Sequence, residues 1–251
     1  MPQAGLAEPS GLDAREESGL FWTVSDGTAA LIALQTEPLN AQVAVSHDIR
    51  GIEGVARGWD SGIVLMVHEE SNSLVWLNTN VTKGPRSLPI AKLKGFDAVA
   101  KHFSTKAQNK GLEGIAVDRA GQRVFVVKEG QPRVLLEISS DLDRVVYHTV
   151  LKKDLGFHVK GLKDHKLDIS GLFYDPNRDA LWMASDRGEC VFLYDLQSNT
   201  AQRIEILPHK GKLPDLKGIE GISLNEDGSE LFLVSDAGKK SSLTKLALID
   251  E

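Results

Sequence analysis

Acidic side chains recur at fixed positions in five similar segments of the chain, and carboxylate oxygens gathered in this way could bind a divalent cation. Each segment contains a glycine that follows Ser or Glu, and an acid always stands 15 residues after it. The glycines are Gly11, Gly54, Gly114, Gly171 and Gly221. The acids are Asp26, Glu69, Glu129, Asp186 and Asp236, and we call them the second column because they follow the second strand of each segment. Because the interval is the same in all five copies, we interpret the segments as an internal repeat.

Another set of acids stands just before the same glycines. Three segments have a glutamate directly before the glycine, and the two that have Ser10 or Ser170 there carry an acid two residues earlier. This first-strand column consists of Glu53, Glu113, Glu220, Glu8 and Asp168. Side chains two residues apart on a strand point to the same side. We therefore predict that each segment places one carboxylate on the same side of its first strand.

The elements that must position these acids are short β-strands. Segment four illustrates the plan: an alternating strand, a turn at 175–178, an apolar strand over 181–184, and a third strand over 191–196. A weaker fourth strand follows, as at 203–207. Four short strands in about 50 residues, repeated five times, are typical of a β-propeller.

The sequence thus predicts an all-β fold, a five-bladed β-propeller with four-stranded antiparallel blades, as one domain over residues 1–251. The blades are expected to start near residues 8, 51, 111, 168 and 218. The last segment ends soon after its third strand, so we expect its fourth strand to be short or missing. Two longer intervals predict surface insertions, a short amphipathic helix over 96–109 and a basic loop over 152–166.

The predicted hairpins bring the two acidic columns to the same end of the molecule. The first strand of a hairpin starts beside the end of the second, and the first strands of the blades line a propeller's central channel. Up to ten acids are then expected at one mouth, where like charges cost free energy unless a cation or protonation relieves them. Calcium suits such a site because it takes about 6–8 oxygen ligands in flexible geometry.

Each column also has a structural interpretation. An acid after the second strand can stabilise the next turn by accepting hydrogen bonds from backbone N–H groups, so the second column is predicted to supply either ligands or turn residues. A glycine at the start of the first strand can let neighbouring sheets approach closely. We predict metal ligands in the first-strand column, and we favour Glu53, Glu113 and Glu220 because they share one sequence context.

Composition narrows the classes of partner. Acids outnumber Lys and Arg by 35 to 29, and the net charge of −6 argues against a nucleic acid or a polybasic membrane contact. The single cysteine, Cys190, excludes an intramolecular disulfide and a multi-cysteine zinc site. No apolar run reaches the length of about 18 residues that a membrane helix needs, and the first residues lack the features of a signal peptide. We expect a soluble monomer that is not inserted in a membrane.

Short motifs follow one another in a fixed order along almost the whole chain. They are E-x-S-G-L near the start, L-E-G-I-A-x-D followed by V-K-E-x-x-P around Glu113 to Pro132, then D-I-S-G-L and I-E-G-I-S. This order resembles the SdiA-regulated family of bacterial proteins. The resemblance implies a five-bladed propeller distantly related to NHL-repeat propellers, with a calcium site at the acidic motif positions and no established activity. Family members often carry an N-terminal anchor or export signal, which implies a periplasmic or membrane-anchored setting, although this chain shows neither.

Three functions are compatible with this pattern. The first is a calcium-binding propeller that binds a small molecule or a protein at its acidic mouth. The second is a metal-dependent hydrolase of lactones, esters or phosphoesters that uses the axial metal as a Lewis acid, with His68 as a candidate base near the mouth. The third is a scaffold whose acids are merely solvated. The sequence contains no nucleophile–base motif, so the choice between enzyme and binding module stays open.

Overall fold

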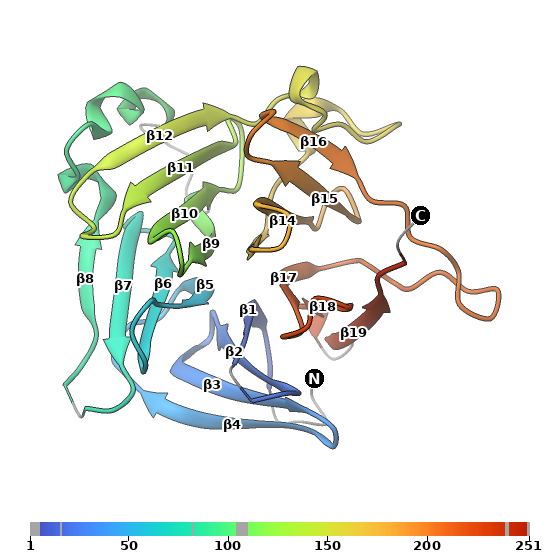
Figure 1. The fold of residues 1–251 in the computed structure, drawn as a ribbon, viewed down its shortest axis with the longest axis horizontal. Helices are drawn as coiled ribbons and strands as arrows, with labels where there is room; N and C mark the ends of the chain where they lie inside the picture. The colour runs from blue at the N-terminus through green and yellow to red at the C-terminus, as the bar shows by residue number, and fades with distance from the viewer. Residues whose placement is uncertain (1–5, 16, 82, 104–109, 239–240, 250–251) are drawn as a thin grey trace.

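Five β-sheets stand around a central axis and form the blades of a propeller (Figure 1). This computed structural model describes residues 6–15, 17–81, 83–103, 110–238 and 241–249. Within each blade the strands are antiparallel, and they follow one another from the axis outward in chain order. The predicted five-bladed propeller is confirmed.

The strands of the five blades have the following bounds. Blade 1 contains β1 (Pro9–Ala14), β2 (Leu20–Ser25), β3 (Thr28–Thr36) and β4 (Leu39–Ser46). Blade 2 contains β5 (Ile52–Arg57), β6 (Ile63–His68), β7 (Ser73–Asn78) and β8 (Arg86–Pro89). Blade 3 contains β9 (Leu112–Asp118), β10 (Arg123–Lys128), β11 (Val134–Ser139) and β12 (Val145–Val150). Blade 4 contains β13 (Gly171–Asp175), β14 (Ala180–Ser185), β15 (Cys190–Asp195) and β16 (Thr200–Arg203), and blade 5 contains β17 (Ile219–Leu224), β18 (Glu230–Ser235) and β19 (Ser242–Ala247).

Strand sequences change with distance from the axis because the burial of the strands changes. The second strand of blade 4, β14, is buried at every position, since the neighbouring blades cover both of its faces, and its sequence ALWMAS is almost wholly apolar. The outer strand β12 is partly or fully exposed at every position and reads VVYHTV. Cys190 is buried in β15, where burial raises the pKa of its thiol to about 11, so it is a packing residue.

The blades pack face to face, and a separate apolar core fills each interface. Between blades 2 and 3, for example, Leu65 packs with Ile115 and Val126. The ring closes in the same way between the last and first blades, where the ring centroids of Phe21 and Phe232 lie 4.8 Å apart. Blade 5 has three strands within the described residues, which agrees with the expectation of a short or missing fourth strand.

Glycines at the start of the inner strands let these strands approach one another around the axis. A Cβ atom on Gly54 would lie 2.7 Å from the carbonyl oxygen of Glu113, and one on Gly221 would lie 2.6 Å from the carbonyl carbon of Gly11. Both distances are too short for a side chain. The predicted packing role of the glycine that anchors the repeat is therefore confirmed at these positions.

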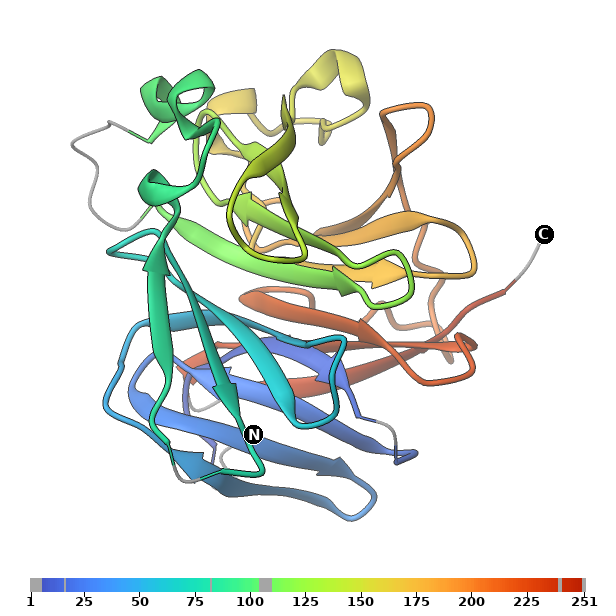
Figure 2. The same ribbon diagram turned by 60° about the vertical axis from the view of Figure 1, so that its left-hand side comes forward.

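Two insertions extend from the edge of the molecule near blade 3 (Figure 2). The first contains the short 3₁₀ helices η2 (Ile90–Lys92), η3 (Phe96–Ala98) and η4 (Ala100–His102), rather than the single amphipathic helix expected over 96–109, of which 104–109 lie outside the described residues. The second contains η5 (Lys153–Leu155) and η6 (Asp164–Lys166). The fully buried Arg133 fastens it to blade 3 by donating hydrogen bonds to the carbonyl oxygens of Leu151, Asp164 and Leu167.

In the described part of the chain, no helix is long and apolar enough to cross a bilayer.

Candidate metal centre

The three glutamates favoured from the sequence sit at irregularities in the inner strands. In the pairing of β5 with β6, Ile52 faces His68 and Gly54 faces Val67, so Glu53 is an extra residue without a partner. Glu113 and Glu220 are displaced in the same way in β9 and β17. Such a bulge turns the side chain away from the alternating pattern of its strand. A β-bulge in its own strand therefore sets the direction of each of these glutamate side chains.

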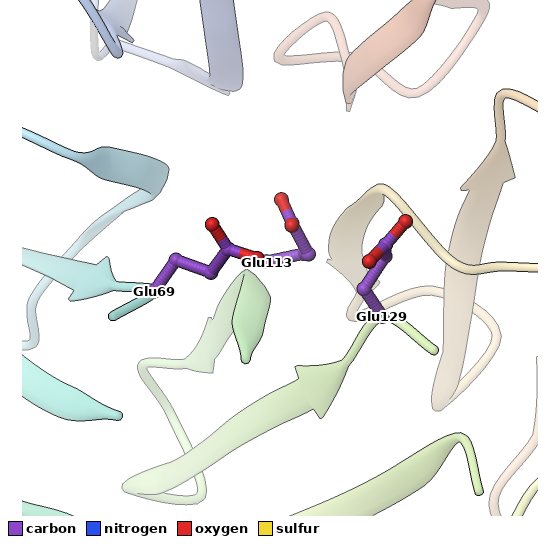
Figure 3. Close-up of side chains that lie close together, drawn as sticks. All are labelled: Glu69, Glu113 and Glu129. Carbon is purple, nitrogen blue, oxygen red and sulfur yellow. The ribbon is translucent and has the colours of Figure 1, made fainter. Parts of the chain in front are cut away.

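One of these glutamates meets two acids of the second column. Glu69 directly follows β6, and Glu129 directly follows β10. With Glu113 they each contribute one carboxylate oxygen to a group whose members all lie within 4.8 Å of one another. Figure 3 shows Glu113 between the other two side chains, with the three carboxylates directed into the space at the centre of the ring. We call Glu69, Glu113 and Glu129 the acidic trio.

Electrostatics make the ionised form of these acids costly. Burial raises the pKa of Glu113 well above its usual value, and the charges of Glu53, Glu129, Glu69 and Glu220 raise it further. The pKa of Glu129 is also raised, again chiefly by burial. A cation among the three oxygens would replace the protons that burial favours on Glu113 and Glu129.

The other two first-strand glutamates belong to the same electrostatic group. Burial raises the pKa of Glu53 to about 7, with Asp26 as the largest contributing charge. Burial raises the pKa of Glu220 to about 9, and the charges of Asp186 and Glu53 act in the same direction. The group of interacting carboxyl groups at this mouth therefore extends beyond the acidic trio.

A basic residue that the repeat pattern did not reveal lies beside the acidic trio. The Nζ atom of Lys110 is 3.7 Å from a carboxylate oxygen of Glu129, and the lysine side chain is partly exposed. Its charge lowers the pKa of Glu129 and opposes the effect of burial. Lys110 stands in the segment before β9 and outside both acidic columns, so the repeat of acids does not indicate it.

The remaining residues of the first-strand column face a turn. The carboxylate of Asp168 accepts hydrogen bonds from Ser185 Oγ at 2.6 Å and from the Arg187 N–H at 3.1 Å. In blade 1, the carboxylate of Glu8 lies against Gly27 in the equivalent turn after β2. These two acids stabilise or cover turns within their own blades, and within the described residues neither is part of the acidic trio.

Several acids of the second column also have structural partners. Asp186 accepts a hydrogen bond from the Gly218 N–H at 2.6 Å, and Glu69 accepts one from the Gly111 N–H at 3.3 Å. Each bond links the end of one blade's second strand to the entry of the next blade. Asp236 instead accepts the N–H of Gly238 in its own turn. The proposed turn role therefore holds for Asp236, while Asp186 and Glu69 connect blades.

A cavity of about 670 Å³ adjoins the acidic mouth between blades 1 and 2. Its lining includes Asp26, Glu53 and Glu69 together with His68. The Nδ1 atom of His68 accepts a hydrogen bond from the Ser71 N–H at 3.1 Å, which fixes the orientation of the ring. A ligand in this cavity would therefore contact the carboxylates of both columns.

The sheets and the axial acids define a five-bladed β-propeller with a group of carboxylates at one end of its channel. The chain matches the family model described as SdiA-regulated over residues 2–238, and it therefore belongs to the SdiA-regulated family.

Solved structures share the fold at low identity. A chain in the crystal structure of a nidogen/laminin complex is 11% identical with a TM-score of 0.57, and the match covers 96% of this chain and 76% of that chain. A structural genomics protein of unknown function from Bacteroides thetaiotaomicron VPI-5482 is also 11% identical with a TM-score of 0.57. That match covers 91% of this chain and 52% of that chain, so this protein spans about half the length of the second structure. At this identity the likeness establishes the fold alone.

Proposed function

We propose that the acidic trio binds a calcium ion and that the protein is a calcium-dependent binding module whose ligand sits at this mouth. The observation that carries the proposal is the convergence of one carboxylate oxygen from each of Glu69, Glu113 and Glu129 within 4.8 Å. Two neighbouring blades supply these residues, so a bound ion would also join the blades.

The chemistry of the donors favours calcium over softer metals. All three donors are carboxylate oxygens, which suit calcium, magnesium and manganese, whereas zinc and copper sites commonly use imidazole or thiolate. Calcium tolerates the irregular geometry of side chains that come from different strands. The raised pKa of Glu113 supports the same conclusion, because a divalent ion would offset the burial and repulsion that oppose its ionisation.

The trio supplies fewer oxygens than calcium usually takes, which are about 6–8. The remaining positions would be filled by water or by oxygen atoms of a ligand in the adjoining cavity. Through those positions the ion could hold a ligand that carries carboxylate, hydroxyl or phosphate oxygens. The proposed module therefore needs calcium for ligand binding, not only for folding.

The coordination positions that the trio would leave to water or a ligand also support a second candidate function, a metal-dependent hydrolase of lactones, esters or phosphoesters. A catalytic metal keeps an open position for water or substrate, and His68 lines the cavity next to the trio. The observation that favours this candidate is that the imidazole of His68 and the carboxylate of Glu69 line the same cavity. In this candidate, His68 would take the proton from the attacking water.

Calcium binding is tested by calorimetry and thermal unfolding after treatment with EGTA. We expect calcium to bind with a stoichiometry of about one and to raise the Tm, and we expect Glu113→Gln to weaken binding by about tenfold or more. The exposed Glu205 provides a matched control, and Glu205→Gln should bind calcium normally. Absence of calcium binding by the native protein would refute the proposal.

The two candidate functions differ in a further measurement. Hydrolysis of lactone, ester and phosphoester substrates is assayed with calcium, manganese and zinc for the native protein and His68→Gln. Turnover that requires both the metal and His68 would establish the hydrolase. Calcium binding without such turnover would favour the binding module.

A further inference from the structure

The opposite mouth of the channel holds a second cavity that the acidic centre does not involve. It has a volume of about 350 Å³, within the usual range for small-molecule sites. The last residue of every inner strand lines it, and these residues are Ala14, Arg57, Asp118, Asp175 and Leu224. Because Glu53, Glu113 and Glu220 stand near the starts of their strands, this cavity lies at the other end of the axis. We call it the far-mouth cavity.

Two arginines on neighbouring blades line the far-mouth cavity. Arg57 ends β5, and Arg119 directly follows β9. Both also line a second hollow of about 270 Å³, to which Arg15 contributes from blade 1. The guanidinium of Arg15 lies 4.4 Å from the ring centroid of Trp22, which holds it at the rim. Arg57 and Arg119 therefore border both hollows, whereas Arg15 borders only the second and forms an ion pair with Glu17 at 3.3 Å.

Two of the acids in the far-mouth cavity are already bonded to donors of the protein. Asp118 accepts the Gly121 N–H at 2.9 Å and forms an ion pair with Arg123 at 2.8 Å. Asp175 is buried, forms an ion pair with Arg178 at 2.9 Å, and accepts the indole N–H of Trp182 at 3.0 Å. These local partners offset both charges, so these acids do not make the cavity strongly negative.

Asp13 and the exposed Glu226 also line the cavity, and Asp13 is the one that contacts Arg57. Its carboxylate accepts the backbone N–H of Arg57 at 2.5 Å and lies 3.9 Å from the guanidinium Nε of the same residue. Burial raises the pKa of Asp13 to about 6, while the charges of Arg57 and Arg119 lower it. Within the described residues Arg119 forms no hydrogen bond or ion pair with any side chain, so its fork of donors is available to a ligand.

We propose that the far-mouth cavity binds a small organic anion, a carboxylate or a phosphate monoester, through the guanidinium groups of Arg119 and Arg57. Arginine is suited to this because its planar donors pair with two oxygens of a carboxylate or phosphate at once. The inner strands of all five blades fix the walls of the cavity, so little ordering is needed when a ligand binds. Asp13 competes with the ligand for Arg57 and sets an upper limit on affinity.

The test uses three probes built on one sugar: glucuronate, glucose 6-phosphate and uncharged glucose. Binding is measured by calorimetry in EGTA, so the outcome does not depend on calcium at the acidic mouth. We expect at least one of the two anions to bind and glucose not to bind. The anion that binds identifies the ligand as a carboxylate or a phosphate.

Variants locate the site. Arg119→Gln should weaken anion binding by about tenfold or more, since a charge-assisted bidentate contact is lost. Arg86→Gln is the matched control, because Arg86 is exposed in β8 and lines neither cavity. Asp13→Asn should tighten binding, whereas a residue that only supports the fold would lower stability without this gain. The proposal is overturned if neither anion binds the native protein, or if Arg119→Gln binds as tightly as the native protein.

Discussion

A carboxylate oxygen of Glu113, in the first strand of blade 3, lies within 4.8 Å of one from Glu69, which follows the second strand of blade 2. The pair spans the boundary between two blades. Glu69 also accepts the N–H of Gly111 at the entry to blade 3, so the same side chain connects the backbones of both blades. One side chain, Glu69, therefore belongs to the acidic trio and also connects two blades.

The first prediction concerns the stability of the protein without metal. Glu113→Gln replaces an acid whose ionisation is opposed by burial and by neighbouring carboxylates with a neutral side chain of similar size. We expect the Tm in EGTA to rise by about 3 °C or more, and the additional rise on adding calcium to be lost. A lower Tm in EGTA combined with an unchanged response to calcium would contradict this explanation.

The second prediction concerns pH. In the unfolded chain Glu53 and Glu220 titrate near 4.5, whereas in the folded protein their pKa values are about 7 and about 9. Below pH 4.5 both states hold these protons, so burial carries no charge penalty. As the pH rises above 4.5, the unfolded chain releases the protons first, and stability falls until about pH 7 for Glu53 and about pH 9 for Glu220.

Thermal unfolding in EGTA from pH 5 to pH 9 measures this effect. We expect the Tm to fall by about 5 °C or more over that range, and we expect calcium to restore most of the loss at the alkaline end. The double variant Glu53→Gln/Glu220→Gln should show a flatter profile. A Tm that rises with pH in the native protein would show that these carboxyls are not the dominant titrating groups.

The third prediction tests the close approach of inner strands. A Cβ atom on Gly54 would lie 2.7 Å from the Glu113 carbonyl oxygen, so Gly54→Ala should lower the free energy of unfolding by about 1–3 kcal/mol. Gly84 has no atom within 4 Å of the equivalent Cβ position, and Gly84→Ala should change stability by less than about 0.5 kcal/mol. Denaturant unfolding measures both variants, and equal effects would argue against the packing role.

The fourth prediction separates turn acids from metal ligands. Asp168→Asn weakens the hydrogen bonds from Ser185 and Arg187, so the free energy of unfolding should fall by about 1–2 kcal/mol. Calcium affinity, measured by calorimetry, should change by less than about threefold. A loss of affinity as large as that of Glu113→Gln would assign Asp168 to the metal centre instead.

Much of the fold followed from the repeat. The interval between anchor glycine and acid fixed the hairpin at the start of each blade, and the observed inner strands begin one to three residues after the predicted blade starts. Alternating and apolar runs identified the first three strands of each blade because these strands bury a defined face against a neighbouring blade. The fourth strand expected over 203–207 was placed wrongly, since the exposed β16 spans Thr200–Arg203. The insertion over 96–109 was predicted less well, since its described residues form two short 3₁₀ helices, η3 and η4, which give no single helical period.

The grouping of the acids could be predicted only in part. The sequence placed both columns at one mouth, and it identified Glu113, Glu69 and Glu129 as candidates. It assigned ligands by column, whereas the acidic trio combines one residue of the first-strand column with two of the second.

The sequence by itself determined the number of blades, the order of strands and the end of the channel where acids gather, because these follow from periodic patterns along the chain. The tertiary structure alone decided which carboxylates meet, because a bulge at Glu113 and the packing of blade 2 against blade 3 set that distance. It also brought Arg57 and Arg119 to the same cavity at the far mouth. These two residues lie far apart in the sequence, and the packing of blade 2 against blade 3 brings them together.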